Sequence, residues 1–152
     1  QLQQELDKVR QKAILNNPKS WREKHQAFPW VIERLKLLKN EEFDFVVLTT
    51  KSKIFTQDLL QSFNLSPKFI FGHESGAKLN VLLDLSSEYQ VKGFIEDRLS
   101  TLETILTSPK LTHLPCYLAS WGYLKPNDLV APPHGIQILD QEKLATPLAT
   151  WK

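Results

Sequence analysis

The stretch Phe43-Asp44-Phe45-Val46-Val47-Leu48-Thr49 sets the fold class, because it is a short apolar run rich in β-branched and aromatic residues. Four more runs of this kind follow, at residues 69–71, 91–95, 116–119 and 136–139. Stretches with Leu or Ile at helical spacing lie between them, at residues 54–63, 77–85 and 98–106. Near-continuous apolar strands that alternate with helices are typical of a parallel sheet covered on both faces. The sequence therefore predicts an α/β fold.

The residues before this stretch carry a helical pattern. Apolar residues recur at helical spacing between positions 2 and 13, and this first helix should stop before Asn16-Asn17-Pro18, a turn signal. A second helix starts either at Pro18, capped by Asn17, or after Ser20, which has Glu23 at capping-box spacing. A third helix is expected from near Pro29.

Composition narrows the class of protein. The chain has 152 residues, of which 41% are hydrophobic and 24% charged, as in a soluble globular domain. No apolar run approaches the roughly 20 residues of a membrane helix, so we expect a cytoplasmic protein with no membrane partner. The net charge of +2 is spread along the chain, which disfavours a nucleic-acid surface. Cys116 is the single cysteine, and no Cys and His stand at zinc-ligand spacing.

Polar residues follow the first expected strand, at the sheet edge where open parallel sheets bind ligands. Thr49 and Thr50 offer hydroxyls, and turn amides follow them before the next helix begins. The free N–H groups of a helix N-terminus suit an anion such as phosphate. Thr49 and Thr50 are therefore candidate phosphate ligands. The alternative interpretation is that Thr49 only caps the helix.

Two further strand ends carry charged residues. Lys78 stands at the start of the helix after the second strand, where the alternative is an ordinary solvated lysine. The third strand ends in Glu96-Asp97, and paired carboxylates suit Mg²⁺, which takes one or two of them with waters and substrate phosphate. The alternative here is that Asp97 caps a helix beginning at Arg98. Hydroxyl, amine and acidic pair at successive strand ends together predict a site for phosphate and magnesium.

In this order the residues resemble the motifs of the haloacid dehalogenase-like hydrolases. The run Val46-Val47-Leu48-Thr49 resembles the second motif, which ends on a hydroxyl that binds the phosphoryl group. Lys78 matches the lysine of the third motif, and Phe94-Ile95-Glu96-Asp97 matches the fourth motif in its paired-acid form. The more usual fourth motif has Gly at position 96 and a second Asp at position 101, which is Thr101 here.

The resemblance covers about residues 28–144, and the stretch Trp121-Gly122-Tyr123 is similar to the phosphoglycolate-phosphatase-like branch. It implies a Rossmann-like α/β core at residues 28–152, preceded by a helical remnant of a cap domain at residues 1–27. It implies Mg²⁺ as the cofactor and a small phosphorylated metabolite as the substrate. The residues that it assigns are Thr49 and Lys78 for catalysis, Thr49, Thr50 and Lys78 for phosphate, and Glu96 and Asp97 for the metal.

The family's first motif, Asp-x-Asp after a first strand, has no match in these 152 residues. In the family this motif supplies the nucleophile that becomes an aspartyl phosphate and a second Asp for acid–base work. Its strand is also the centre of the sheet, between the strands expected at residues 43–49 and 91–95. The chain contains no Met and begins with Gln1, so we expect an upstream segment, or another chain, to supply that strand. Without it the chain should be inactive and should expose two strand edges.

Two other functions are alternatives to the hydrolase. Thr101 and the absent nucleophile favour a non-catalytic Rossmann-like module for binding or interaction. Nucleotide binding through a glycine-rich loop is disfavoured, because the chain has 5 glycines and neither of the phosphate-binding glycine motifs. The expected enzyme class is a magnesium-dependent phosphomonoester hydrolase that is incomplete as this chain.

Overall fold

A computed structural model describes residues 2–151 of the chain and divides them into two compact units. The N-terminal unit ends at Ser75, and the C-terminal unit begins at Gly76. Each unit consists of helices and a short parallel sheet, which confirms the predicted α/β class. Within residues 2–151 no helix combines the length and the apolar character that crossing a membrane requires.

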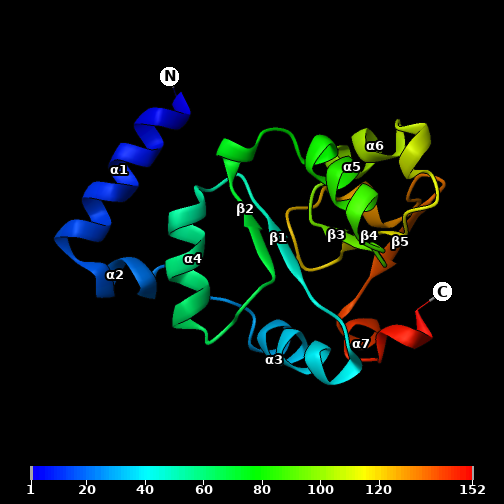
Figure 1. Cartoon of the computed structure of the whole chain (residues 1–152), viewed down its shortest axis with the longest axis horizontal. Helices are drawn as coiled ribbons and strands as arrows, with labels where there is room; N and C mark the ends of the chain where they lie inside the picture. Colours follow the sequence, from blue (N-terminus) through cyan, green and yellow to red (C-terminus); the bar gives the residue numbers. More distant parts are fainter. Residues whose placement is uncertain (1, 152) are drawn as a thin grey trace. The chain divides into compact units, whose positions relative to one another are not determined.

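The N-terminal unit has a two-stranded parallel sheet (Figure 1). Its strands β1 (Val46–Leu48) and β2 (Phe69–Phe71) pair with Val46 opposite Phe69, and α4 (Lys53–Ser62) connects them. Before β1 come the helices α1 (Leu2–Asn16), α2 (Pro18–Glu23), α3 (Pro29–Leu37) and the 3-10 turn η1 (Leu38–Glu41). A second 3-10 turn, η2 (His73–Ser75), follows β2.

Local signals explain where these helices begin and what holds them. Asn17 caps α2 by accepting a hydrogen bond from the Ser20 amide at 3.0 Å, and the helix starts at Pro18. Of the two expected starts, the one at Pro18 is therefore confirmed. Arg22 of α2 pairs with Asp58 of α4 at 2.7 Å. A buried charge requires a partner of opposite sign. The buried guanidinium of Arg34 in α3 donates two hydrogen bonds to the carboxylate oxygens of Glu41, at 2.5 and 3.0 Å.

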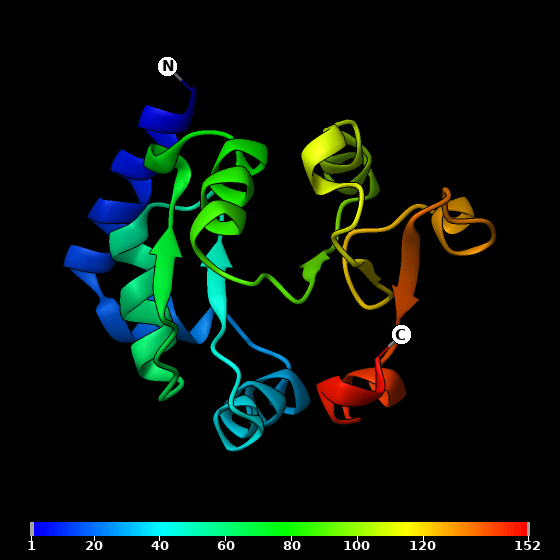
Figure 2. The same cartoon turned by 45° about the vertical axis from the view of Figure 1, so that its right-hand side comes forward.

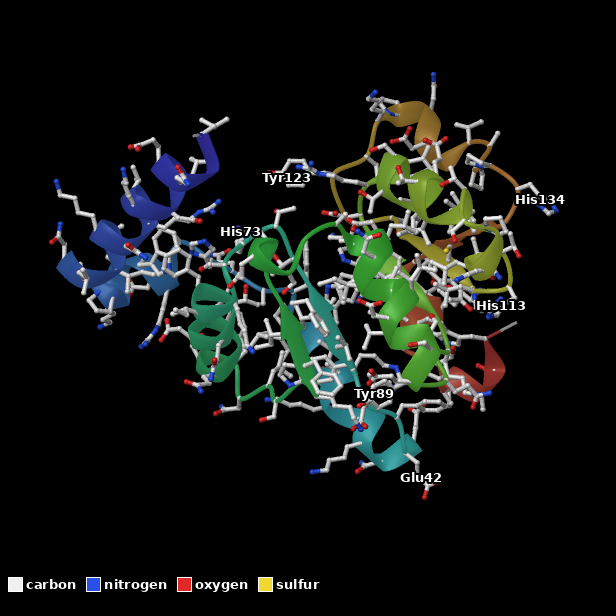
Figure 3. All side chains as sticks on the ribbon, turned by 45° about the horizontal axis from the view of Figure 1, so that its top comes forward. Glu42, His73, Tyr89, His113, Tyr123 and His134 are labelled. Carbon is white, nitrogen blue, oxygen red and sulfur yellow. The ribbon has the colours of Figure 1, made fainter. Side chains whose placement is uncertain are left out.

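The turn after β2 joins three parts of the N-terminal unit. Gly72 passes so close to α4 that a Cβ atom there would lie 2.4 Å from the Lys53 nitrogen, which leaves room for glycine alone. His73 pairs with Asp7 of α1 at 2.7 Å, and its side chain is labelled in Figure 3. The Glu74 carboxylate accepts the Lys53 amide at 2.8 Å, at the first turn of α4.

The C-terminal unit has a three-stranded parallel sheet in the order β3-β4-β5 (Figure 2). Its elements are α5 (Lys78–Glu88), β3 (Phe94–Glu96), α6 (Leu99–Leu106), η3 (Pro109–Leu111), β4 (Cys116–Ala119), η4 (Pro126–Leu129), β5 (Ile136–Leu139), α7 (Gln141–Leu144) and η5 (Leu148–Thr150). Tyr117 of β4 packs edge-on against Trp151 at 5.0 Å, so the last turn covers part of the sheet. The most deeply buried side chains are those of Leu102, Ile105, Leu111, Cys116, Leu118 and Leu139.

Four strands stand at sheet edges: β1 and β2 in the first sheet, β3 and β5 in the second. β1 pairs only with β2 and β3 pairs only with β4 among residues 2–151, so each has one edge without a strand partner. The strand expected at residues 43–49 is shorter in the structure, where β1 spans 46–48. The strand expected at 91–95 lies further along the chain, where β3 spans 94–96. The proposed boundary between a cap remnant at 1–27 and a core at 28–152 stays a prediction.

The Glu74 contact makes stability depend on pH. Burial raises the pKa of Glu74, but the backbone N–H groups of Glu74 itself and of Lys53 outweigh this effect and lower it overall. A lowered pKa in the folded state means stabilisation above the ordinary carboxyl pKa, lost as the pH falls through the folded value. Glu74→Ala should therefore reduce the free energy of unfolding at pH 7 by about 0.5 kcal/mol, after solvent screening, with little effect near pH 3.

Urea unfolding at the two pH values measures this difference. Glu33→Ala, which removes an exposed glutamate of α3, is the matched control and should change stability equally at both. A loss for Glu74→Ala that is as large near pH 3 as at pH 7 would show that the charge of Glu74 is not what stabilises α4.

Candidate functional site

An ion pair between Lys78 and Glu96 stands at the centre of the candidate site. Lys78 is the first residue of α5, and Glu96 is the last residue of β3. The ammonium of Lys78 donates a hydrogen bond to Oε2 of Glu96, whose side chain is only 6% exposed. A buried carboxylate needs a positive partner, and Lys78 supplies it. The alternative that Lys78 is a solvated surface lysine is therefore wrong, since its side chain is 23% exposed and paired.

The second oxygen of Glu96 organises the turn that follows β3. Oε1 accepts the backbone N–H of Asp97 at 2.9 Å and that of Arg98 at 3.3 Å. Helix α6 begins at Leu99 with Arg98 in the capping position, and no side chain caps it. The alternative that Asp97 caps this helix is therefore wrong, and the side chain of Asp97 is half-buried.

Gly122 makes close contact with Asp97. It lies in the turn after β4, where its amide bonds to the Ala119 carbonyl at 3.2 Å. A Cβ atom at position 122 would lie 2.2 Å from the Cβ of Asp97, so glycine alone leaves Asp97 in its place. The sequence offered one signal for this residue, a glycine just past a strand end, but which residue it packs against comes only from the structure.

Glu96 and Asp97 are the residues that the sequence predicts as magnesium ligands. Among residues 2–151 no three His, Cys, Asp or Glu side chains gather as metal ligands. Magnesium needs only one or two protein carboxylates, but Oε1 of Glu96 already accepts two hydrogen bonds and only Oε2 keeps a lone pair beyond the one that it accepts. The imidazoles of His113 and His134 are exposed on the C-terminal unit, each labelled in Figure 3. That Glu96 and Asp97 hold a metal ion stays a prediction.

Thr49 occupies the end of β1 in the N-terminal unit. Its amide donates to the Phe71 carbonyl at 2.9 Å, and its hydroxyl oxygen accepts the Lys51 amide at 3.1 Å. Ser52 caps α4, so the alternative that Thr49 is the helix cap is wrong. A hydroxyl that accepts one hydrogen bond still has its own O–H to donate, and a phosphate oxygen is a suitable acceptor. Thr50 beside it is exposed.

The start of α4 differs from what the sequence suggested. Free amides were expected there for an anion, but the Lys53 amide is bound by the Glu74 carboxylate and the Phe55 amide faces the Ser52 hydroxyl. The negative group at this helix terminus therefore comes from the chain itself. Sequence could not show it, because Glu74 lies 21 residues after Lys53.

The predicted site residues fall into two groups. Lys78, Glu96 and Asp97 come together in the C-terminal unit, whereas Thr49 and Thr50 belong to the N-terminal unit, and their action on one ligand stays a prediction. Cys116 takes no part in this chemistry. It is fully buried, and burial raises the pKa of its thiol, so it is a core residue as expected and no thiolate nucleophile.

Comparison of the chain with models of protein families, with curated proteins and with solved structures gives no match. The function is therefore inferred from the residues and their geometry. The chemically most informative feature is the buried carboxylate of Glu96, which is paired with Lys78. It lies at the carboxyl end of β3, and a second acid, Asp97, follows it in the sequence.

The contact between Gly122 and Asp97 gives a test of the site's packing. Gly122→Ala forces Asp97 to move, and overpacking of this kind destabilises by about 1–3 kcal/mol. Tyr123→Ala is the matched control, because Tyr123 is 86% exposed and its removal should change stability by less than about 0.5 kcal/mol. Urea unfolding of both variants measures the difference. Equal stability of Gly122→Ala and the unchanged protein would refute the close contact.

Proposed function

We propose that this chain is part of a magnesium-dependent phosphomonoester hydrolase of the haloacid dehalogenase-like kind. The observation that carries the proposal is the Lys78–Glu96 pair with Asp97 beside it, at the end of β3. Lys78 carries one positive charge and the two acids carry two negative charges, so the cluster has a net negative charge. Such a cluster attracts a divalent cation, and the bound cation would then attract a phosphate. A cationic centre flanked by Lys78 then suits a phosphomonoester dianion.

Each residue has a role in the proposed reaction. Lys78 offsets negative charge on the phosphoryl group, and Thr49 and Thr50 donate hydrogen bonds to its oxygens. Glu96 and Asp97 hold Mg²⁺, which supplies charge neutralisation at the phosphoryl oxygens when bound. Glu96 also accepts a hydrogen bond from the ammonium of Lys78, so the same carboxylate fixes the position of the lysine.

The nucleophile of this proposal is an Asp that residues 1–152 do not supply in an Asp-x-Asp motif. Its carboxylate would attack phosphorus and release the alcohol, and water would then hydrolyse the aspartyl phosphate. We place this Asp on a strand from an upstream segment or another chain. The edges of β1 and β3 without a strand partner among residues 2–151 support this, because each sheet can accept one more parallel strand.

The proposed substrate is a small phosphorylated metabolite, and a cytoplasmic location belongs to the same proposal. The alternative function, a non-catalytic Rossmann-like module, is favoured by Thr101 in place of a second motif Asp. The upstream coding sequence separates the two: an apolar strand followed by Asp-x-Asp supports the enzyme, and its absence supports the module.

Magnesium-dependent hydrolysis of an aryl phosphate tests the enzyme directly, in protein that carries the upstream coding segment. Lys78→Met should lower the rate by about 10²–10³-fold, because it removes a charge aimed at the phosphoryl group. Asp97→Ala should lower it by at least about 10²-fold and raise the magnesium concentration needed for half the maximal rate. The chain of 152 residues alone should show no activity.

Exposed residues of the same types provide the controls. Asp84→Ala in α5 removes an exposed aspartate, and Lys92→Met removes an exposed lysine; neither should change the rate. An Asp97→Ala variant as active as the unchanged protein would show that the metal assignment is wrong. Full activity of Lys78→Met would show that Lys78 does not act on the phosphoryl group.

A further inference from the structure

The hydrogen bonds of Glu96 leave room for one further ligand on its carboxylate. Oε1 accepts the backbone N–H groups of Asp97 and Arg98 at 2.9 and 3.3 Å, which uses both of its lone pairs. Oε2 accepts a hydrogen bond from the ammonium of Lys78, so one lone pair remains on that oxygen. A cation that needs only one or two protein carboxylates therefore fits Glu96 through the oxygen that already binds Lys78.

A magnesium ion and the ammonium of Lys78 compete for Oε2 of Glu96. Magnesium lies about 2.1 Å from its oxygen ligands, and an ammonium lies about 2.8 Å from a carboxylate oxygen. Two such cations on one oxygen are therefore less than about 5 Å apart, whatever their directions. Charges of the same sign repel each other strongly at this distance where little water screens them. Water screens poorly here, because the side chain of Glu96 is 6% exposed.

The ammonium of Lys78 can leave Glu96 without loss of the site. Its side chain is 23% exposed, so it borders solvent, and its stem of four carbons is flexible. Glu96 stays in place when the ammonium moves, because the amides of Asp97 and Arg98 bind its other oxygen. An arriving cation supplies the positive charge that a buried carboxylate requires. Lys78 is thus an internal counter-ion of Glu96 that another cation can replace.

The second cationic residue of this turn differs from Lys78. Arg98 binds Glu96 through its backbone N–H, and its side chain is exposed. Water and salt screen an exposed charge, so the guanidinium of Arg98 changes the affinity of a nearby cation only weakly. A comparison of the two residues therefore separates competition at Oε2 from the general effect of a positive charge nearby.

We propose that Lys78 blocks the metal position on Glu96 until a cation displaces it, and that the released ammonium then binds the phosphoryl group. This inference rests on the proposed function and adds an order to it, in which the cation binds before the phosphate. Until then Glu96 fixes the position of Lys78, and the net negative charge of the cluster repels a phosphate. Coupling between two ligands is reciprocal, so phosphate must raise the affinity for the cation by the same factor.

Titration of the chain with Mn²⁺, which prefers the same oxygen ligands as Mg²⁺, tests this competition without any enzyme activity. Electron paramagnetic resonance measures the free Mn²⁺. Lys78→Gln should bind Mn²⁺ at least about tenfold more tightly than the unchanged chain, because the competing charge is gone. Arg98→Gln should change the affinity less than about threefold. Inorganic phosphate should tighten Mn²⁺ binding by the unchanged chain, and Lys78→Gln should lose most of this gain.

Acylation of lysine amines by acetic anhydride follows Lys78 in the unchanged chain, so the result does not depend on the folding of a variant. Peptide masses give the rate of modification at each lysine. Mg²⁺ should speed the modification of Lys78 severalfold, because the amine leaves its carboxylate partner. The exposed Lys92 is the control, and its rate should stay the same. Should Lys78→Gln fail to fold, this measurement alone decides.

The results distinguish failure of this inference from failure of the proposed function. Asp97→Asn should weaken Mn²⁺ binding by the unchanged chain at least about tenfold. If it does so, but Lys78→Gln binds no more tightly than Arg98→Gln and Mg²⁺ leaves Lys78 as slow to react as before, the inference is wrong and the metal assignment stands. If neither the unchanged chain nor Lys78→Gln binds Mn²⁺ at millimolar concentration, the metal assignment is wrong, and the inference falls with it.

Discussion

The C-terminal unit depends on one buried carboxylate, that of Glu96. An ionised side chain that is 6% exposed is tolerated only with its partners in place, and removal of one partner of such a pair costs about 3–5 kcal/mol. Here the partners come from both neighbours of β3: the Lys78 ammonium at the start of α5, and the amides of Asp97 and Arg98 before α6. One side chain thus fixes two connections at the carboxyl end of a strand.

The second constraint is that neither sheet is closed at its edge. Sheets of two and three strands are small, and unpaired edges of β1 and β3 expose backbone groups that other chains can bind. In the proposed hydrolase the same added strand would satisfy an open edge and bring the nucleophilic Asp to the acidic pair. Fold and chemistry would then depend on a single segment.

Much of the fold could be predicted from sequence where the pattern is local. The strands at 69–71, 116–119 and 136–139 were predicted at their observed bounds, because turn residues limit each apolar run. The strands expected at 43–49 and 91–95 were misplaced by a few residues, since the extent of β1 and β3 depends on partner strands elsewhere in the chain. Lys78, Glu96 and Asp97 were identified from their place after strands. The pairing of Lys78 with Glu96, the packing of Gly122 on Asp97 and the capture of Lys53 by Glu74 join residues 18 or more positions apart, so no local pattern could reveal them.

Hydrogen exchange at the edge strands tests most directly whether one added strand completes both the fold and the site. It compares the chain of 152 residues with protein that carries the upstream coding segment. If that segment supplies the central strand, exchange at residues 46–48 and 94–96 should slow together by at least about tenfold, while β4, already paired on both sides, changes little. Unchanged exchange at either edge strand, or edges already as protected as β4 in the shorter chain, would contradict it.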